Sequence, residues 1–238
     1  MPRWYEGPLA GFDLETTGPD PHTARIVQAA VRNFRGDGQT GNILARDWMV
    51  AVEEDIPAAA QAVHGITTER ARAEGRPLVA VLPEIVDALR AAWERGGPVV
   101  AYNASFDLTI LCLECERAGL PRPELGPVVD PMVLDRHVDR YRRGSRKLVD
   151  VAAHYRIAVE KAHDAGADAL TAMRVAWQIG KRFSEVGALA LPDLHRLQVG
   201  WAREQREDLQ AYLRRTKDPA AVVDPGWPLT EAYTSGRR

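Results

Sequence analysis

Apolar residues in the first part of the chain gather in short runs bounded by glycine, proline and polar residues, a pattern typical of β-strands. The runs at residues 9–14, 26–34 and 42–50 predict three strands, with Gly36-Asp37-Gly38 as the turn between the last two. Strands joined by such short connections predict an antiparallel meander. The following segment, around residues 56–67, is expected to be a loop.

The apolar spacing becomes helical after residue 77. Val81, Ile85, Leu89 and Trp93 follow one another at intervals of four and predict a helix that ends at Gly96-Gly97. Buried strands and helices then alternate along the chain. Strands are predicted at 98–102 and 127–129, and helices at 106–118, 131–140, 147–155 and 164–183.

This order of elements predicts an α/β fold class. A meander followed by alternating strands and helices favours a mixed five-stranded sheet, antiparallel first and then parallel, flanked by helices. Asp130-Pro131 is typical of a helix N-cap followed by proline at the first helical position. We therefore expect residues 1–183 to form one domain, and residues 184–238 to form a small helical C-terminal appendage with a tail rich in proline, glycine and small residues.

The composition narrows the class of protein. A chain of 238 residues with 45% hydrophobic residues suits one α/β domain of ordinary size with an appendage. The start of the chain lacks the pattern of a signal peptide, and no apolar run approaches the ~20 residues that span a membrane. A cytoplasmic protein is expected.

The net charge of −2 gives no global attraction to nucleic acid, although charge is unevenly spread. Residues 136–147 hold six basic residues and a single acid. This stretch is equally consistent with an edge that contacts phosphates and with a solvated loop between helices.

Cys112 and Cys115 have the C-x-x-C spacing that also occurs in redox and zinc sites. Leu108, Leu111, Cys112 and Cys115, however, lie at i, i+3, i+4 and i+7, the spacing of one helix face. Packing in the core is therefore favoured for both cysteines.

Four acidic residues stand beside these predicted elements. Asp13 and Glu15 close the first strand, two positions apart, so their side chains leave the strand on one face. Asp107 lies one turn into the helix after the strand at 98–102, and Asp168 lies in the helix at 164–183. An acid pair alone is expected by chance in a chain with 33 acidic residues, so their order and setting carry the signal. Carboxylates gathered in one pocket repel one another unless cations lie between them, which predicts hard divalent ions.

His163 precedes Asp168 by five residues. We place His163 just before the helix, because five residues along a helix would turn the two side chains about 140° apart. A histidine that is neutral near pH 7 suits proton transfer. Together these residues predict a two-metal phosphodiester hydrolase. One cation, on Asp13, Glu15 and Asp168, would activate water for deprotonation by His163, and a second, on Asp13 and Asp107, would stabilise the leaving 3′-oxygen.

The segments that carry these residues also resemble a known family. Asp13-x-Glu15-Thr16-Thr17-Gly18, Asn103-x-x-Phe106-Asp107 and His163-x4-Asp168, in this order, are similar to the motifs of the DEDDh 3′–5′ exonucleases of the ribonuclease H-like fold. That family includes the proofreading epsilon subunits of bacterial DNA polymerase III, ribonuclease T and oligoribonuclease. The resemblance covers roughly residues 8–180. It implies removal of nucleotides from a 3′ end with two Mg²⁺ or Mn²⁺ ions, metal-ligand roles for Asp13, Glu15, Asp107 and Asp168, and a general-base role for His163.

The same motifs supply candidate substrate contacts. Thr16 and Thr17 are expected to offer backbone N–H groups to the terminal sugar, and Phe106, close to Asn103, is expected to stack on a base. Val63-His64-Gly65-Ile66 resembles the family's loop that lies against the terminal nucleotide, with packing of His64 in a loop as the alternative.

The expected partner is nucleic acid with a free 3′ end, with single-stranded DNA preferred. Association with a polymerase stays open, because residues 205–212 only loosely approach a clamp-binding peptide. Three alternatives remain: a 3′–5′ exoribonuclease that trims short RNA, a two-metal phosphoesterase of small molecules, and a catalytically silent nucleic-acid-binding module.

Overall fold

The computed structural model describes residues 3–34, 44–159 and 162–235. Its centre is one five-stranded sheet in the order β3-β2-β1-β4-β5. The two pairs formed by β1, β2 and β3 are antiparallel, and β4 runs parallel to both β1 and β5. The predicted mixed sheet is therefore confirmed. The strands span Leu9–Thr16 (β1), Ile26–Phe34 (β2), Leu44–Met49 (β3), Val99–Val100 (β4) and Val128–Val129 (β5).

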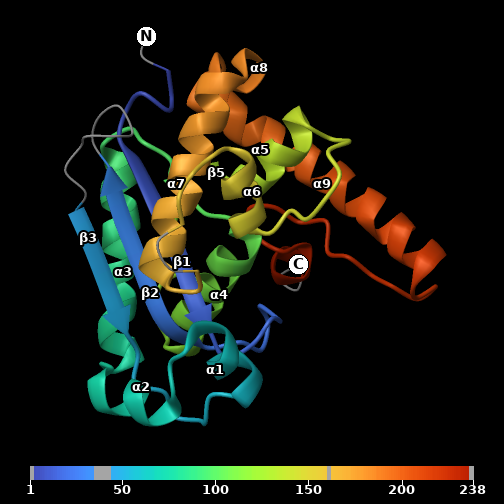
Figure 1. Ribbon diagram of the computed structural model, residues 1–238. Helices are drawn as coiled ribbons and strands as arrows, with labels where there is room; N and C mark the ends of the chain where they lie inside the picture. Colours follow the sequence, from blue (N-terminus) through green and yellow to red (C-terminus); the bar gives the residue numbers. More distant parts are fainter. Residues whose placement is uncertain (1–2, 35–43, 160–161, 236–238) are drawn as a thin grey trace.

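Helices cover both faces of the sheet (Figure 1). On one face α3 (Leu78–Glu94) and α4 (Ala104–Arg117) pack against β1 and β2 in one hydrophobic core. On the other face α7 (Ala165–Arg182) lies along β1 and β2, with α5 (Pro131–Val138) and α6 (Leu148–His154) beside it. Cys112 and Cys115 are buried in α4 and form no disulfide, in keeping with a packing role.

Strand β1 serves both cores because its side chains alternate between the two faces. Ala10, Phe12 and Leu14 belong to the core with α3 and α4. The alternate positions, beginning with Leu9, face α7, and Gly11 among them allows the helix to approach closely. A Cβ atom at Gly11 would lie 2.3 Å from the carbonyl oxygen of Ala169 in α7. The absence of a side chain at this position therefore brings the first turns of α7 directly over β1.

Helix α1 (Ala58–His64) occupies most of the segment 56–67 for which a loop is predicted, and a second short helix, α2 (Thr68–Glu74), follows it. Helix α1 ends at Gly65, which has a φ of 73°, and α2 begins at Thr67, whose side chain accepts a hydrogen bond from the N–H of Arg70. Helices of seven residues are too short to show a repeating apolar period, so capping residues define them instead. The predicted turn at 36–38 and the first two positions of the predicted third strand lie outside the described residues.

The C-terminal part of the chain returns to the body of the protein. Helix α9 (Leu191–Thr216) follows the short α8 (Ser184–Gly187) and packs against α5 and β5, while its last turns project outward (Figure 1). The tail then runs back to α4, where Trp227 and Tyr233 are buried, and ends in α10 (Glu231–Ser235). The proposed division at residue 183 stays a prediction. Among the described helices, none combines the length and apolar character that crossing a membrane requires.

Candidate active site

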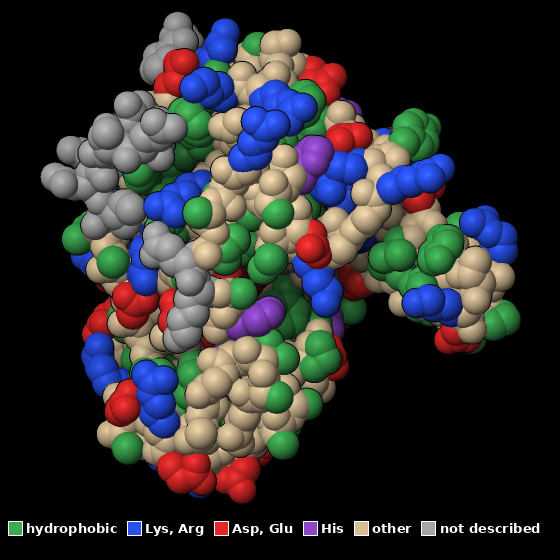
Figure 2. Space-filling model, in the orientation of Figure 1, with side chains coloured by type: hydrophobic (Ala, Val, Ile, Leu, Met, Phe, Trp, Pro, Cys, Tyr) green, Lys and Arg blue, Asp and Glu red, His purple; other side chains and the backbone are tan. Residues whose placement is uncertain are grey.

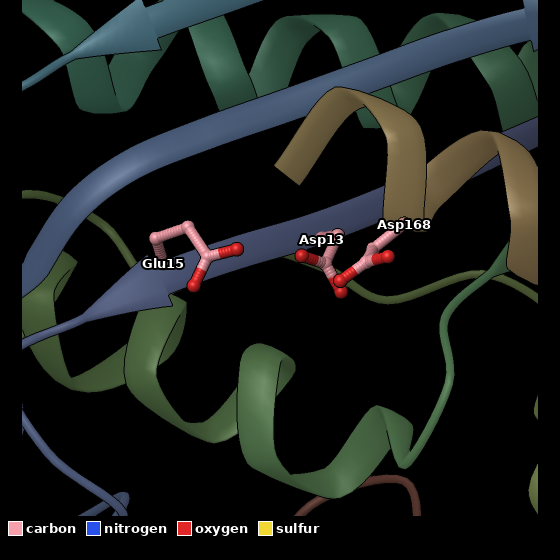
Figure 3. A group of neighbouring side chains, drawn as sticks. All are labelled: Asp13, Glu15 and Asp168. Atoms are coloured by element: carbon pink, nitrogen blue, oxygen red, sulfur yellow. The ribbon is translucent and has the colours of Figure 1, made fainter. Parts of the chain in front are cut away.

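Three carboxylates meet between β1 and α7 (Figure 3). Asp13 and Glu15 project from the same face of β1, and Asp168 projects from the first turn of α7. One oxygen of each carboxylate lies within 4.8 Å of one oxygen of both others. Glu15 and Asp168 are brought together because α7 lies so close to β1 at Gly11. The structure thus assembles three of the four acids that the sequence singles out.

The fourth acid, Asp107, reaches the same place from α4. Strand β4 pairs with β1 only at Ala10 and Gly11, so the later residues of β1 have no strand partner on that side. The Oδ1 atom of Asp107 takes this place and accepts a hydrogen bond of 3.1 Å from the N–H of Leu14. Because Leu14 lies between Asp13 and Glu15, this bond holds the Asp107 carboxylate beside them.

Burial and mutual repulsion make these carboxylates hard to ionise without cations. Burial raises the pKa of Asp13 well above its usual range, and the charges of Asp107, Glu15 and Asp168 raise it further. Burial, followed by the charge of Asp168, raises the pKa of Glu15 to about 7. Burial likewise raises the pKa of Asp107 and of Asp168.

The chemistry of the donor set fits divalent metal ions. The four side chains present only oxygen atoms, the ligands that Mg²⁺ and Mn²⁺ prefer. Asp168 Oδ1 is buried and has no hydrogen-bond partner among the described residues. An ion beside Asp168 would supply that missing partner and relieve the repulsion among the carboxylates.

The turn before α7 places His163 next to Asp168. Asp164 caps the helix by accepting a 3.2 Å hydrogen bond from the N–H of Ala167. His163 adopts a left-handed conformation with a φ of 59°, and its backbone N–H donates to Asp168 Oδ2 at 3.0 Å. Its side chain is exposed. His163 therefore lies just outside the helix, as predicted, at the edge of the carboxylate group.

His64 approaches the site from the end of α1. Its Nδ1 accepts a 3.1 Å hydrogen bond from the N–H of Ile66, so the proton of the neutral ring is on Nε2. The Nε2 atom is buried and has no partner of good hydrogen-bond geometry among the described residues. Burial lowers the pKa of His64, and the nearby His163 lowers it further, whereas the Thr16 backbone opposes the shift. A neutral donor thus lies beside β1, and Val63, next to it, is 53% exposed.

The other predicted substrate contacts surround the ends of β1 and β4. Thr16 Oγ1 donates to the carbonyl oxygen of Gly18, and Thr17 Oγ1 accepts from the N–H of Arg25, so both side chains shape the turn after β1. Asn103 begins α4 in a left-handed conformation with a φ of 63°, and Phe106 is half-buried in the first turn. The structure places each of these residues near an acid, and their roles stay predictions.

Asp130 has a larger role than the sequence indicates. Its buried carboxylate caps α5 through the N–H of Met132, as predicted, and it also accepts hydrogen bonds from the N–H groups of Asn103 and Ala104 at the start of α4. Trp227, almost a hundred residues later in the chain, donates its indole N–H to the same carboxylate at 3.2 Å. Asp130-Pro131 gives a signal for the first cap, but no local pattern signals the other contacts.

Comparison with known proteins identifies the class of this fold and site. The model of the exonuclease family matches residues 10–176, which include all four acids and His163. The chain therefore belongs to the exonuclease family, and the enzyme class and the resemblance stated from the sequence motifs are confirmed.

Related sequences come mainly from bacterial DNA polymerases. The chain is 30% identical over 187 residues to the PolC-type DNA polymerase III of Streptococcus sanguinis, a match that spans 77% of this chain and 12% of that protein. A DNA polymerase III subunit epsilon-like protein of Rhodobacter capsulatus is 40% identical over 104 residues, or 42% of this chain and 13% of the relative. The 3′–5′ exonuclease DinG of Bacillus subtilis is 27% identical over 188 residues, which span 78% of this chain and 19% of that protein. The chain thus corresponds to less than a fifth of the length of these relatives.

Solved structures confirm the predicted ribonuclease H-like fold. Exonuclease I of E. coli, in complex with a dT13 oligonucleotide, has a TM-score of 0.64 at 19% identity, covering 76% of this chain and 43% of that one. Exonuclease X, in complex with 5′ overhanging duplex DNA, has a TM-score of 0.57 at 19% identity, covering 80% and 99%. At such identities the likeness concerns the fold alone.

Proposed function

We propose that this protein is a 3′–5′ exonuclease that hydrolyses phosphodiester bonds from the 3′ end of DNA and releases nucleoside 5′-monophosphates. The observation that carries the proposal is the group formed by Asp13, Glu15 and Asp168, within 4.8 Å of one another and with Asp107 held beside them by Leu14. Membership of the exonuclease family supports it independently.

The four acids would hold two divalent ions, Mg²⁺ or Mn²⁺. Asp13, Glu15 and Asp168 would ligate one ion, and Asp13 and Asp107 the other. Bound ions of this kind lower the pKa of water and stabilise negative charge on a leaving oxygen. The contribution of the protein is a rigid frame, in which β1, α4 and α7 hold the carboxylates before any ion arrives.

The two histidines would have different tasks. His163 is exposed beside Asp168, so its ring can accept the proton of an attacking water and pass it to solvent. His64 is buried and neutral, and its Nε2–H has no partner of good hydrogen-bond geometry among the described residues, which suits hydrogen bonding to the substrate. Thr16, Asn103 and Phe106, around the same acids, would position the terminal nucleotide.

The names of the related proteins support DNA rather than RNA as the substrate. The related sequences are named as DNA polymerases and a 3′–5′ exonuclease, and exonuclease I, which shares the fold, was solved with a DNA oligonucleotide. Proofreading or repair of DNA is the corresponding task. The names of the relatives favour association with a polymerase, whereas residues 205–212 only loosely approach a clamp-binding peptide.

Degradation of 5′-labelled strands tests the proposal. Single-stranded DNA, the matched RNA and duplex DNA with a mismatched 3′ end would each be incubated with Mg²⁺, Mn²⁺ or EDTA, with Asp13→Ala protein as the control. Shortening from the 3′ end that is lost in EDTA and in the variant is expected, with DNA degraded fastest. Faster loss of RNA would favour an exoribonuclease. If no polymer shortens with either metal, the exonuclease proposal is wrong, and a small-molecule phosphoesterase or a silent binding module would remain.

A further inference from the structure

A groove of about 740 Å³ opens between α5, the connection from α5 to α6, and α9. It lies on the α7 side of the sheet, where α9 stands away from the body in Figure 1. Its outer wall belongs to α9, beyond the residues that the family model matches. Figure 2 shows Lys and Arg side chains over this part of the surface. None of the four acids or two histidines of the candidate active site lines it.

Arginines outnumber acidic residues in the lining of the groove. Arg136, Arg140, Arg142 and Arg146 contribute four positive charges, and the acids in the lining are Glu204 and Asp208. Among the lining side chains, positive charge thus exceeds negative charge, on a protein whose overall charge is −2. A local field of this sign attracts a polyanion, although the molecule as a whole does not.

Two of these arginines are fixed before any ligand binds. Arg142 and Arg146 both donate to the buried carboxylate of Asp135, at 2.7 and 2.5 Å, and the hydroxyl of Tyr155 donates to its other oxygen. The Asp135 carboxylate therefore holds two guanidinium groups, and Asp139 Oδ2 also lies 3.8 Å from Arg142 Nε. Because the two guanidinium groups are held in place, a ligand need not order them, and little entropy is lost on binding.

The other two arginines, Arg136 and Arg140, can bind a phosphate group without breaking a strong ion pair. Arg140 pairs with Asp208 at 2.7 Å, but both side chains are more than half exposed, and such a pair contributes only about 0–1 kcal/mol. A phosphate group can therefore replace the Asp208 carboxylate at little cost. Arg136 forms no ion pair with any carboxylate that the structure describes.

Aromatic rings accompany the arginines. Trp201 of α9 is stacked on His137, with ring centres 3.7 Å apart and an angle of 15° between the planes. Tyr212 is 46% exposed at the outer end of the groove, and Tyr141, next to Arg140, is 89% exposed. Basic side chains with exposed rings between them are the pattern by which proteins bind single strands, through phosphates and stacked bases together.

The groove is tied to the segment that carries Asp107. The hydroxyl of Tyr102 donates to the carbonyl oxygen of Arg146 at 2.5 Å, and Arg206 of α9 donates to Ser105 Oγ at 2.5 Å. Tyr102 and Ser105 lie on either side of Asn103 at the start of α4. Both walls of the groove are thus fixed to the short segment that leads into Asp107.

From this arrangement we propose that the groove binds the phosphate backbone of the substrate strand on the 5′ side of the nucleotide at the carboxylates. This inference rests on the proposed exonuclease function. The groove would hold a single strand without reading its sequence and would lower the KM for strands long enough to reach it. An acidic protein surface is the alternative occupant, and it is an outcome of the test below.

The test separates the groove from the site of hydrolysis by comparing substrates of different length. The variant Arg136→Glu/Arg140→Glu leaves the Asp135 contacts intact. The control variant Arg90→Glu/Arg95→Glu, in α3 and directly after it, gives the same change in net charge away from the groove. Each would be assayed on the p-nitrophenyl ester of thymidine 5′-monophosphate and on oligothymidylates of about 3 and about 15 nucleotides. Tyr212→Ala is a second groove variant, which removes a ring without altering charge.

The expected result is a defect confined to the long strand. Each lost phosphate contact should reduce the slope of log affinity against log salt concentration by about 0.7. Loss of two contacts should therefore reduce that slope by about 1.4 and, near 0.1 M salt, raise KM roughly 25-fold. Tyr212→Ala should also raise the KM for the long strand. The kcat of both groove variants and their rate on the ester should stay unchanged, and the Arg90→Glu/Arg95→Glu control should behave like the unaltered protein.

Three other outcomes are informative. An unchanged KM and salt slope for the long strand would overturn the inference and leave an acidic protein as the occupant. Equal losses on the ester and the long strand would also overturn it, because the arginines would then act at the carboxylates. If the unaltered protein hydrolyses none of the three substrates with Mg²⁺ or Mn²⁺, the proposed function itself is wrong.

Discussion

Replacing Glu15 by glutamine should stabilise the metal-free protein at pH 8 while it abolishes activity. The pKa of Glu15 is about 7 in the folded protein, against 4.5 for an ordinary glutamate. At about 1.4 kcal/mol for each unit, ionising Glu15 in the folded state costs roughly 3 kcal/mol. Glutamine resembles the protonated acid and avoids most of this cost.

The direction of the pKa shift of Glu15 determines the pH range in which Glu15→Gln is more stable than the unaltered protein. Because folding raises the pKa of Glu15, the folded state binds more protons than the unfolded state. The stabilising effect of the bound proton is complete below pH 4.5 and is lost as the pH rises to about 7. The difference between Glu15→Gln and the unaltered protein should therefore be near zero below pH 4.5, grow through this range and level off above pH 7.

Urea unfolding in EDTA at a series of pH values measures this difference. The exposed residue Glu54 supplies a matched control, because Glu54→Gln removes the same charge from a solvated turn and should change little. In Mg²⁺ the unaltered protein should instead be more stable than Glu15→Gln, because an ion bound to the folded state stabilises the protein that keeps the Glu15 carboxylate as a ligand. If Glu15→Gln unfolds at the same or a lower urea concentration than the unaltered protein at pH 8 in EDTA, the reasoning about crowded carboxylates is refuted.

Three further predictions follow from single contacts. His163→Ala should slow strand shortening about 10²–10⁴-fold in a gel assay with little change in urea unfolding, because its side chain is exposed; full activity at neutral pH would contradict the role as base. Trp227→Phe keeps an aromatic ring, although a smaller one, and removes the N–H that donates to Asp130. It should cost about 1–3 kcal/mol of unfolding free energy, and an unchanged urea midpoint would show that this bond contributes nothing. Gly11→Ala places a Cβ atom 2.3 Å from the carbonyl oxygen of Ala169, so it should displace α7 and lower the melting temperature. Calorimetry that finds unaltered stability and unaltered metal affinity would disprove the close approach.

The parts of the fold that local patterns encode were predictable from the sequence. The apolar runs gave β1 and β2, and the two-residue spacing of Asp13 and Glu15 placed both acids on one face of β1. The five-residue spacing of His163 and Asp168 likewise placed the histidine just outside α7. In each case the relation depends on geometry within a single element, which period and spacing describe directly.

Relations between distant residues could not be read in this way. The bond from Leu14 to Asp107 depends on how early β4 ends, and the predicted strand at 98–102 is longer than the observed pair Val99–Val100. The contact between Asp130 and Trp227 joins residues 97 positions apart. Helices α1 and α2 were missed because a seven-residue helix is too short for its period to stand out. Contacts of this kind are decided by packing in three dimensions rather than by local propensity.

The return of the chain to α4 sets an order of events during synthesis on the ribosome. Trp227 and Tyr233 cover α4, and Trp227 supplies a bond to the carboxylate that caps the same helix, more than a hundred residues after α4 has emerged. The nascent chain can therefore assemble its sheet early, but it leaves an apolar surface and a buried acid incompletely covered until residue 233 is available. During this interval the half-finished protein would be a target for chaperones that hold exposed apolar surface. Damage to residues 227–233 would consequently appear as loss of soluble protein before it appeared as loss of catalysis.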